Sequence, residues 1–223
     1  MTPSPQPLTL KVAAGDEELV ISPERLIVAG YTAKDERAVA EHIAELARIG
    51  VPPPPSVPAF YELDPRLLTT EALIDVSGPS TSGEVEPVVI RHRGRHFLAV
   101  GSDHTDRDLE RADIAASKAA CPKPIGDRVV EIGADLAALD WDRLAADSAV
   151  DGRPYQGGSI AALRHPAELM RLLGGVAGDL VLFCGTLPLL NATFVYGASW
   201  QMSLAFPGGP TLTHAYENKQ RSV

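Results

Sequence analysis

Residues 84–110 read EVEPVVIRHRGRHFLAVGSDHTDRDLE and contain two apolar runs separated by Arg93-Gly94. Runs rich in β-branched residues are typical of strands, and a glycine-containing dipeptide between two such runs is typical of a tight turn. The sequence therefore predicts a β-hairpin over residues 84–100. A dense run of polar and charged residues follows the second strand, and a strand end of this kind is a common place for a functional site.

On the N-terminal side of this hairpin, the sequence predicts short strands and one helix. Period-two alternation predicts strands within residues 8–30. Apolar residues at i, i+4 and i+7 predict a helix over residues 33–49, with Thr32 as its N-cap and Gly50 as its C′ residue. A proline-rich connector over residues 51–60 separates this helix from the hairpin region.

On the C-terminal side, two helices and several strands are expected. One helix is expected over residues 105–119, capped by Ser102 or Thr105, and a short one over residues 165–173 with Pro166 at its start. The strands expected, with their turns, lie within residues 127–139, 150–156, 180–185 and 192–206. The element order predicts a mixed α+β protein.

Composition indicates an ordinary globular chain and excludes several classes of protein. The chain has 223 residues, 45% of them hydrophobic and 22% charged, so a single domain over residues 1–223 is expected. The net charge of −9, without a basic stripe, disfavours binding to nucleic acid and to an anionic membrane. The sequence has no apolar run long enough to span a membrane and no signal-peptide pattern. Its two cysteines form no disulfide framework, so a cytoplasmic location is expected.

Glu84 and Glu86 are the first candidates for chemistry. Residues at i and i+2 on a strand project from the same face, so the two carboxylates would repel each other. A hard divalent cation such as Mg²⁺ would relieve this repulsion, because it prefers oxygen ligands. The alternative is a solvated strand face, since charged residues are mostly exposed.

Asp103, Arg107 and Lys118 follow the second strand of the hairpin. Asp103 could ligate a metal from the N-cap of a helix, and Arg107 could bind a substrate carboxylate in fork geometry. The alternative for both is helix capping and surface ion pairing. Lys118 lies among alanines, where it could be desolvated and hold a substrate anion, or it could be an ordinary surface lysine.

His42 and Glu45 lie at i and i+3 on the helix predicted first, so they share a face. A carboxylate beside an imidazole raises its basicity, an arrangement suited to activating water, although a surface ion pair would look the same in sequence. His92 and His96 could form a cupin-like metal site with Glu84 or Glu86. The turn at Gly94 and the neighbouring arginines disfavour that site.

The order of these motifs resembles the fumarylacetoacetate hydrolase family. In chain order the motifs are His42-x-x-Glu45, Glu84-x-Glu86, Ser102-Asp103-x-Thr105-x-Arg107-Asp108-Leu109, Lys118 and Gly185-Thr186. The spacing from Glu86 to Asp103 matches the family, and the resemblance covers roughly residues 26–205. The chain resembles a divergent, uncharacterised branch of it.

The resemblance implies a fold of mixed β-sheets curled into a roll with short peripheral helices. Residues 1–61 would supply N-terminal strands and a mobile lid helix, and residues 62–206 a metal-binding β-roll core. It also implies Mg²⁺ or Mn²⁺, with Ca²⁺ as a further candidate, held by Glu84, Glu86 and Asp103. A homodimer is expected, because dimers are common in the family.

The activity implied is that of a metal-dependent hydrolase or lyase acting on a small 2-oxo acid or 1,3-diketone. Hydrolysis of a C–C bond through a metal-stabilised enolate is the expected reaction. The catalytic residues would be His42, Glu45 and Lys118, and the substrate-binding residues Arg107, Glu110, Gln156 and Thr186.

Departures from the family pattern surround the substrate rather than the metal. The departures are Ser102 for Asn, Glu110 for Gln, Leu187 for Pro, and Pro122-Lys123-Pro124 for Pro-x-Gly-Pro. They imply a retained metal site and an altered substrate. Two alternatives therefore stay open: a sugar-acid dehydratase or isomerase on the same fold, and a non-catalytic binding protein that kept the fold.

Overall fold

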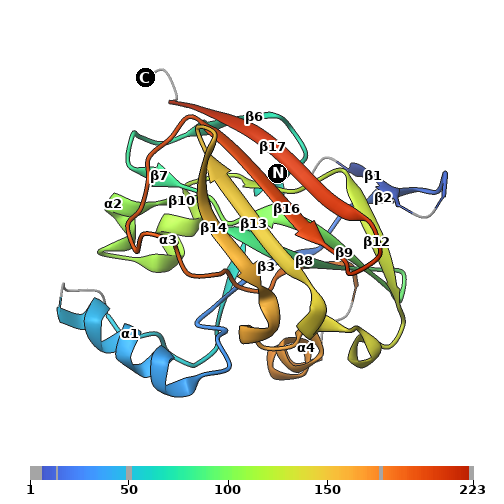
Figure 1. Ribbon diagram of the computed structural model, residues 1–223, viewed down its shortest axis with the longest axis horizontal. Helices are drawn as coiled ribbons and strands as arrows, with labels where there is room; N and C mark the ends of the chain where they lie inside the picture. Colours follow the sequence, from blue (N-terminus) through green and yellow to red (C-terminus); the bar gives the residue numbers. More distant parts are fainter. Residues whose placement is uncertain (1–6, 14, 49–51, 176–177, 221–223) are drawn as a thin grey trace.

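The computed structural model describes residues 7–13, 15–48, 52–175 and 178–220 (Figure 1). In helix α1 (Glu36–Arg48) it describes the backbone throughout, but the side chains of Ala38, His42, Glu45 and Leu46 lie outside the description. Gly50, the predicted C′ residue of this helix, also lies outside the described residues.

The larger sheet is mixed and has eight strands. Its strands, in spatial order, are β2 (Glu18–Ile21), β1 (Leu8–Val12), β12 (Arg128–Gly133), β9 (Arg95–Ser102), β8 (Val85–His92), β15 (Leu180–Phe183), β3 (Arg25–Gly30) and β4 (Ala59–Leu63). The pairs β1–β12 and β3–β15 are parallel, and the other neighbours are antiparallel. The predicted hairpin is confirmed as β8 and β9, and Arg93 and Gly94 adopt φ values of 49° and 77° in its turn.

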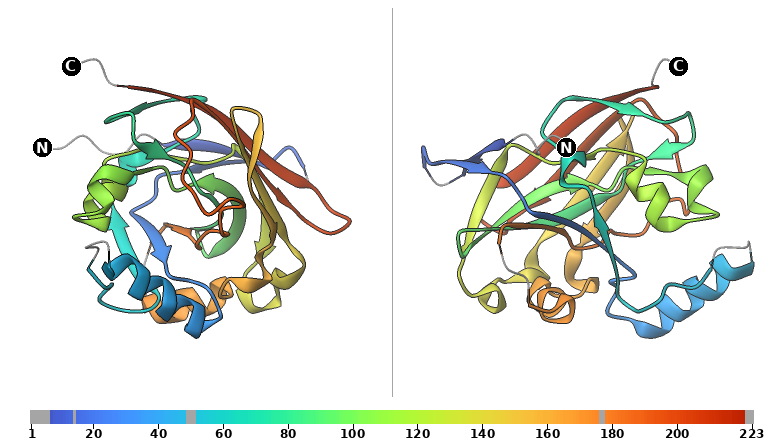
Figure 2. Two further views of the ribbon diagram at one scale, coloured as in Figure 1. Left: turned by 60° about the vertical axis from the view of Figure 1, so that its left-hand side comes forward. Right: turned by 180° about the vertical axis from the view of Figure 1, so that it is seen from behind.

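A second sheet of five strands packs across the first. Its spatial order is β14 (Arg153–Ser159), β13 (Ala145–Val150), β16 (Ser199–Ala205), β17 (Thr211–Gln220) and β6 (Leu73–Val76). Two short pairs complete the sheets, β7 (Thr81–Ser82) with β10 (Thr105–Asp106) and β5 (Leu68–Thr69) with β11 (Lys123–Pro124). In Figure 1 the five-stranded sheet lies in front of β8 and β9, and Figure 2 shows the strands curving around the interior.

The central hairpin is buried on both faces, which explains its almost continuous apolar sequence. Val85 and Val89 face the core shared with the five-stranded sheet, whereas Val88 and Ile90 face a second core on the other side of the large sheet. Period-two alternation thus divides one strand between two cores. The hairpin therefore separates the two cores and packs against both, which holds the residues at its open end in place.

The helices are few and short and lie at the periphery, as Figures 1 and 2 show. They are α1, α2 (Arg107–Glu110), α3 (Ile114–Ala119) and α4 (Pro166–Leu173), and there are 3₁₀ turns at Pro65–Leu67, Leu136–Ala138, Trp141–Arg143 and Ile160–Ala162. None of the described helices is long and apolar enough to cross a membrane. The predicted α+β class, with mixed sheets curled into a roll, is confirmed.

The predicted helix starts need correction in two places. Helix α1 begins at Glu36 rather than at residue 33, and Asp35 instead of Thr32 accepts a hydrogen bond from the first turn, at the Arg37 amide. Thr32 is buried instead. The helix expected over residues 105–119 is two helices after a short strand. Their caps are Asp106 and Asp113, so Ser102, Asp103 and Thr105 are not N-caps.

The C-terminal part also differs from expectation. Residues 192–198 form a loop before β16 rather than a strand, and β17 was not predicted. The pattern in β17 is weak, because only Leu212 and Tyr216 are buried in a strand otherwise made of polar and small residues. The short helix with Pro166 at its start is confirmed, and His165 caps it.

A buried polar group links the two sheets near the open end of the hairpin. Tyr216 Oη on β17 lies 2.8 Å from Ser102 Oγ at the end of β9 and 2.8 Å from His104 Nδ1. Burial, together with the charges of Lys123 and Arg107, lowers the pKa of His104 to about 3. His104 is therefore neutral in the folded protein at pH 7.

This neutral histidine predicts a specific pH dependence of stability. Below pH 6.5, the ordinary pKa of histidine, His104 is protonated in the unfolded chain, whereas in the folded protein it stays neutral down to about pH 3. Stability is therefore lost as the pH falls through this window. Between pH 7.5 and pH 5 the free energy of unfolding of the wild type should fall by about 2 kcal/mol more than that of His104→Asn. Urea unfolding at the two pH values measures this, and equal losses in the two proteins would contradict the assignment.

Candidate functional site

The candidate residues converge from elements that are far apart in sequence. Glu84 immediately precedes β8 and Glu86 is its second residue, Asp103 follows β9, and Arg107 and Lys118 lie on α2 and α3. In Figure 1, α2 and α3 lie with β7 and β10 on the left of the molecule, above α1. Four carboxyl groups and three cationic groups meet there. They are Glu84, Glu86, Asp103 and Glu110 with Arg107, Lys118 and Lys123.

Asp103 is the centre of this cluster. Its side chain is fully buried, and its Oδ2 forms a salt bridge with Lys118 while its Oδ1 lies 3.0 Å from Lys123 Nζ. Lys123 also donates to the carbonyl oxygen of His104 and is itself fully buried. One carboxylate is therefore shared by two lysines, one from α3 and one from β11.

The pKa shifts follow from this arrangement. Burial alone would raise the pKa of Asp103, but the ammonium groups of Lys118 and Lys123 hold it below its usual range. Burial opposes the charge of both lysines. The pKa of Lys118 is nevertheless raised, because Asp103, Glu84 and Glu86 surround it, whereas that of Lys123 is lowered by burial and by Lys118. Lys118 is thus the more firmly protonated of the two.

Arg107 joins two of the other acids. Its Nη1 donates to both oxygens of Glu110 at 3.0 and 2.9 Å, and its Nη2 lies 3.1 Å from Glu84 Oε2. Its Nε donates to Ser82 Oγ at 2.6 Å, and the ring of Phe194 covers the guanidinium at 3.9 Å. Arg107 is buried and holds Glu84 and Glu110 in place, so in this arrangement its fork faces protein carboxylates.

Glu86 is the least compensated acid of the cluster. It is 2% exposed, and its Oε2 accepts a hydrogen bond of 2.8 Å from the Gly185 amide. Burial and the negative charge of Asp103 raise its pKa well above the usual range. Gly185 is required at this contact, because its φ is +100° and a Cβ there would lie 1.7 Å from Thr32 Oγ1.

Gln156 and Thr186 hold the strand between the two glutamates. Gln156 Oε1 accepts from the Val85 amide at 2.9 Å, and its Nε2 donates to Thr186 Oγ1 at 2.7 Å and to the Leu187 carbonyl at 2.6 Å. Thr186 Oγ1 in turn donates to the Val85 carbonyl at 2.8 Å. Both side chains therefore fix the backbone that carries Glu84 and Glu86, and direct contact of either with a substrate stays a prediction.

The remaining histidine candidates fall into two groups. The backbone of His42 and Glu45 lies on α1, but their side chains are outside the described residues, so their role stays a prediction. His92 is at the far end of β8 from Glu86, where its Nδ1 lies 2.5 Å from Asp179 Oδ2. His96 pairs with Arg91 in the same distal part of the hairpin. The cupin-like site is thus contradicted.

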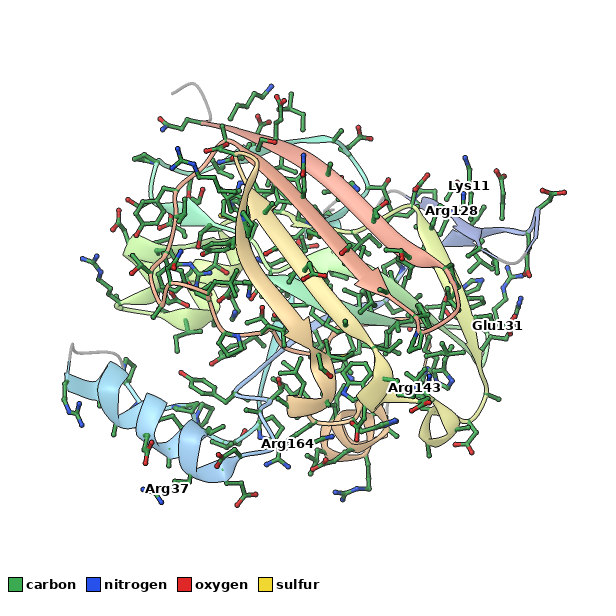
Figure 3. The ribbon with its side chains drawn as sticks, in the orientation of Figure 1. Lys11, Arg37, Arg128, Glu131, Arg143 and Arg164 are labelled. Carbon is green, nitrogen blue, oxygen red and sulfur yellow. The ribbon has the colours of Figure 1, made fainter. Side chains whose placement is uncertain are left out.

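Other ion pairs lie away from the cluster. Arg95 bridges Glu17 and Glu131, and Glu131 is on β12 at the opposite side of the molecule from α2 and α3 (Figure 3). Arg37 points outward from α1 in the same view, and Arg164 pairs with Glu36 and Glu168 near the start of that helix. The two Arg95 pairs are partly exposed to solvent and contribute little to stability, whereas the Arg164 side chain is mostly buried.

Divalent metal ions fit the chemistry of the donor set but not its present arrangement. Carboxylate oxygens are the ligands that Mg²⁺ and Mn²⁺ prefer, and Glu86 is a buried acid near two others. In the part of the chain that the structure describes, however, no three acidic, histidine or cysteine side chains are grouped so that they could hold a metal ion. Lys118 forms a salt bridge with Asp103 Oδ2, so this oxygen could bind a cation only after Lys118 moves away.

Two residues of this region were missed by sequence reasoning. Lys123 is read from sequence only as a departure from the family pattern, and Tyr61, which directly follows the proline-rich connector, is given no role there. Lys123 follows Pro122 in a short strand, and nothing local in the sequence signals that it is buried. Tyr61 on β4 lies close to Lys118, whose Nζ is 5.6 Å from the ring centroid.

The comparisons with known proteins agree with this architecture. A family model described as a protein of unknown function, DUF2848, matches residues 29–216. The chain belongs to this DUF2848 family. No curated protein matches the DUF2848 chain in sequence.

Solved structures resemble the DUF2848 chain over almost its whole length. One is fumarylpyruvate hydrolase from Pseudomonas aeruginosa in complex with Mn²⁺ and pyruvate, with 17% identity, a TM-score of 0.67 and 99% of each chain covered. Another is 5-carboxymethyl-2-hydroxymuconate delta-isomerase from Mycobacterium smegmatis, with 16% identity, a TM-score of 0.59, and 94% of this chain and 87% of that chain covered. At such identities the likeness establishes the fold, and the resemblance to the fumarylacetoacetate hydrolase family is confirmed at that level.

The shared carboxylate predicts a large effect of removing Lys123. Lys123→Met leaves Asp103 buried with one ammonium group fewer, and breaking a buried pair costs about 3 kcal/mol of unfolding free energy. Lys219→Met is the matched control, because Lys219 forms an exposed pair with Asp75 and should cost about 0–1 kcal/mol. Urea unfolding of the two variants compares them, and similar small losses would contradict a structural role for Lys123.

Proposed function

We propose that this protein is a divalent-metal-dependent enzyme that acts on a small 2-oxo acid or 1,3-diketone. Hydrolysis of a C–C bond beside a carbonyl group is the proposed reaction. The observation that carries this proposal is the buried cluster in which Asp103 is shared by Lys118 and Lys123 beside Glu84 and Glu86. The fold likeness to fumarylpyruvate hydrolase, solved with Mn²⁺ and pyruvate, supports the choice of ligands.

Glu84, Glu86 and Asp103 are the residues proposed to hold Mg²⁺ or Mn²⁺. When bound, such a cation supplies Lewis-acid stabilisation of negative charge on a substrate oxygen. Arg107 would keep Glu84 in position through its 3.1 Å contact. The Gly185 amide would fix one oxygen of Glu86.

Lys118 is the proposed catalytic cation. Its side chain is 9% exposed, whereas that of Lys123 is fully buried and also bonded to a backbone carbonyl. Lys118 can therefore leave Asp103 for a substrate oxygen while Lys123 keeps that carboxylate paired. A fixed ammonium group at a developing oxyanion stabilises the transition state.

His42 and Glu45 are proposed to activate water from helix α1. Their i, i+3 spacing places them on one face of the helix, and a carboxylate beside an imidazole favours uptake of the water proton. A positioned base of this kind typically contributes about 10²–10⁴-fold to the rate.

Isomerisation is the second candidate reaction. It is favoured by the likeness to the delta-isomerase from Mycobacterium smegmatis, whose fold this chain shares. Isomerisation would need the same stabilised enolate but no attacking water. Product analysis separates the two, because hydrolysis yields two molecules and isomerisation yields one.

Binding of metal and oxo acid should depend on Glu86. Calorimetric titration of metal-free protein should show one Mn²⁺ site, and oxalate, a planar analogue of an enolised 2-oxo acid, should bind more tightly once Mn²⁺ is present. Glu86→Gln should abolish Mn²⁺ binding. Its unfolding free energy at pH 7 should be unchanged or higher, because burial disfavours the charge of Glu86.

The control for this titration is Glu131→Gln, which changes an acid on β12, on the opposite side of the molecule from α2 and α3. It should bind Mn²⁺ as the wild type does. Undiminished Mn²⁺ binding by folded Glu86→Gln would contradict the proposed metal ligands.

Turnover should depend on Lys118. With acylpyruvates or oxaloacetate as substrates, Lys118→Met should lower kcat/KM by about 10²–10³-fold, the usual effect of removing one donor to an oxyanion. The exposed Lys219→Met is again the control. Steady-state kinetics measures this, and a Lys118→Met enzyme with unchanged kcat/KM would exclude Lys118 from the reaction.

A further inference from the structure

Tyr61 carries a buried hydroxyl group for which the described residues provide no hydrogen-bond partner. A buried polar atom without a partner costs free energy, so such atoms in a folded protein need an explanation. A functional site nearby is one explanation, because a ligand can supply the missing acceptor. The position of Tyr61 makes this explanation specific.

The ring of Tyr61 lies beside the proposed catalytic lysine. Lys118 Nζ is 5.6 Å from the ring centroid. The carboxylates of Glu110 and Asp103 lie close enough to influence its hydroxyl, as does the phenol of Tyr31. Tyr61 therefore borders the charge cluster, although β4 is an edge strand of the large sheet and lies remote from Lys118 in sequence.

The fold fixes the orientation of this ring. Tyr61 pairs with Val28 in the β3–β4 register, two residues from the pair formed by Gly30 and Ala59. A Cβ on Gly30 would lie 3.1 Å from Tyr61 Cε2, so the ring edge rests against the backbone where glycine leaves room. The next residue, Tyr31, has a φ of +57°, which is unusual for a residue other than glycine.

The hydroxyl keeps its proton at neutral pH. Burial, with the neighbouring phenol of Tyr31, raises the pKa of Tyr61 to about 12. The group is therefore a neutral hydrogen-bond donor beside an ammonium group. A neutral donor and a cation together suit an anionic oxygen, because both can point to the same atom or to the two oxygens of one carboxylate.

We propose that the Tyr61 hydroxyl donates a hydrogen bond to an anionic oxygen of the bound 2-oxo acid, next to Lys118. This inference rests on the proposed function and adds a substrate-binding residue to it. The orphaned donor is then satisfied only in the complex. Tyr61 contributes to the affinity for the carboxylate or enolate oxygen and not to the stability of the ligand-free protein.

Tyr61→Phe tests this proposal, because it removes only the hydroxyl. The melting temperature of the ligand-free variant should be unchanged or higher than that of the wild type, since a buried unpaired group is lost. In calorimetry with Mn²⁺ present, the Kd for oxalate should rise about tenfold or more, as expected for a lost bond to a charged group, while the Kd for Mn²⁺ stays unchanged. Tyr196→Phe, on an exposed loop, is the control and should change neither.

Each other outcome has a defined meaning. An unchanged oxalate Kd in Tyr61→Phe would overturn the inference. A lower melting temperature of the variant as well would show that the hydroxyl forms a hydrogen bond within the protein. Loss of both Mn²⁺ and oxalate binding would indicate a structural role and also overturn it. If wild-type protein bound no oxalate with or without Mn²⁺, the proposed function would fail and the inference with it. If oxalate bound without Mn²⁺ and Tyr61→Phe weakened it, the inference would stand and only the metal dependence would fail.

Discussion

The carboxylate of Asp103, buried between the ammonium groups of Lys118 and Lys123, is the interaction on which the arrangement of the site depends. A charge removed from water must be paired, or burial becomes prohibitively costly. The pairing ties the end of β9 to α3 and to β11. The site and the local fold are therefore specified by the same contacts.

Because Asp103 is paired with two lysines, one of them can move to a ligand while the other stays paired. Lys123 is fixed by a second bond to the His104 carbonyl, whereas Lys118 is near the surface of the cluster and next to Tyr61. If Lys118 moves to a ligand, Asp103 keeps a partner. Glu84 and Glu86 are held in place independently of Lys118, because Gln156 and Thr186 form hydrogen bonds with the backbone of Val85 between them. Rigid carboxylates and one movable cation are a suitable combination for binding an anion beside a metal ion.

The sequence predicted the parts of this site that depend on local pattern. The β8–β9 hairpin followed from its apolar runs and turn, and the positions of Glu86, Asp103 and Lys118 near each other followed from the family-like spacing. Lys123 and Tyr61 could not be found in this way, because their importance arises from long-range packing of β11 and β4. The cap of α2 was also predicted wrongly: several acids and hydroxyls precede the helix, and the residue that accepts from its first amides is Asp106.

We propose that this charge cluster binds a divalent cation and an oxo acid together. The most direct measurement is anomalous diffraction at the manganese edge from crystals grown with Mn²⁺ and oxalate. We expect one anomalous peak among the carboxylates of Glu84, Glu86 and Asp103, with oxalate beside it and Lys118 turned away from Asp103. A peak elsewhere, or no peak with Lys118 still paired to Asp103, would contradict it.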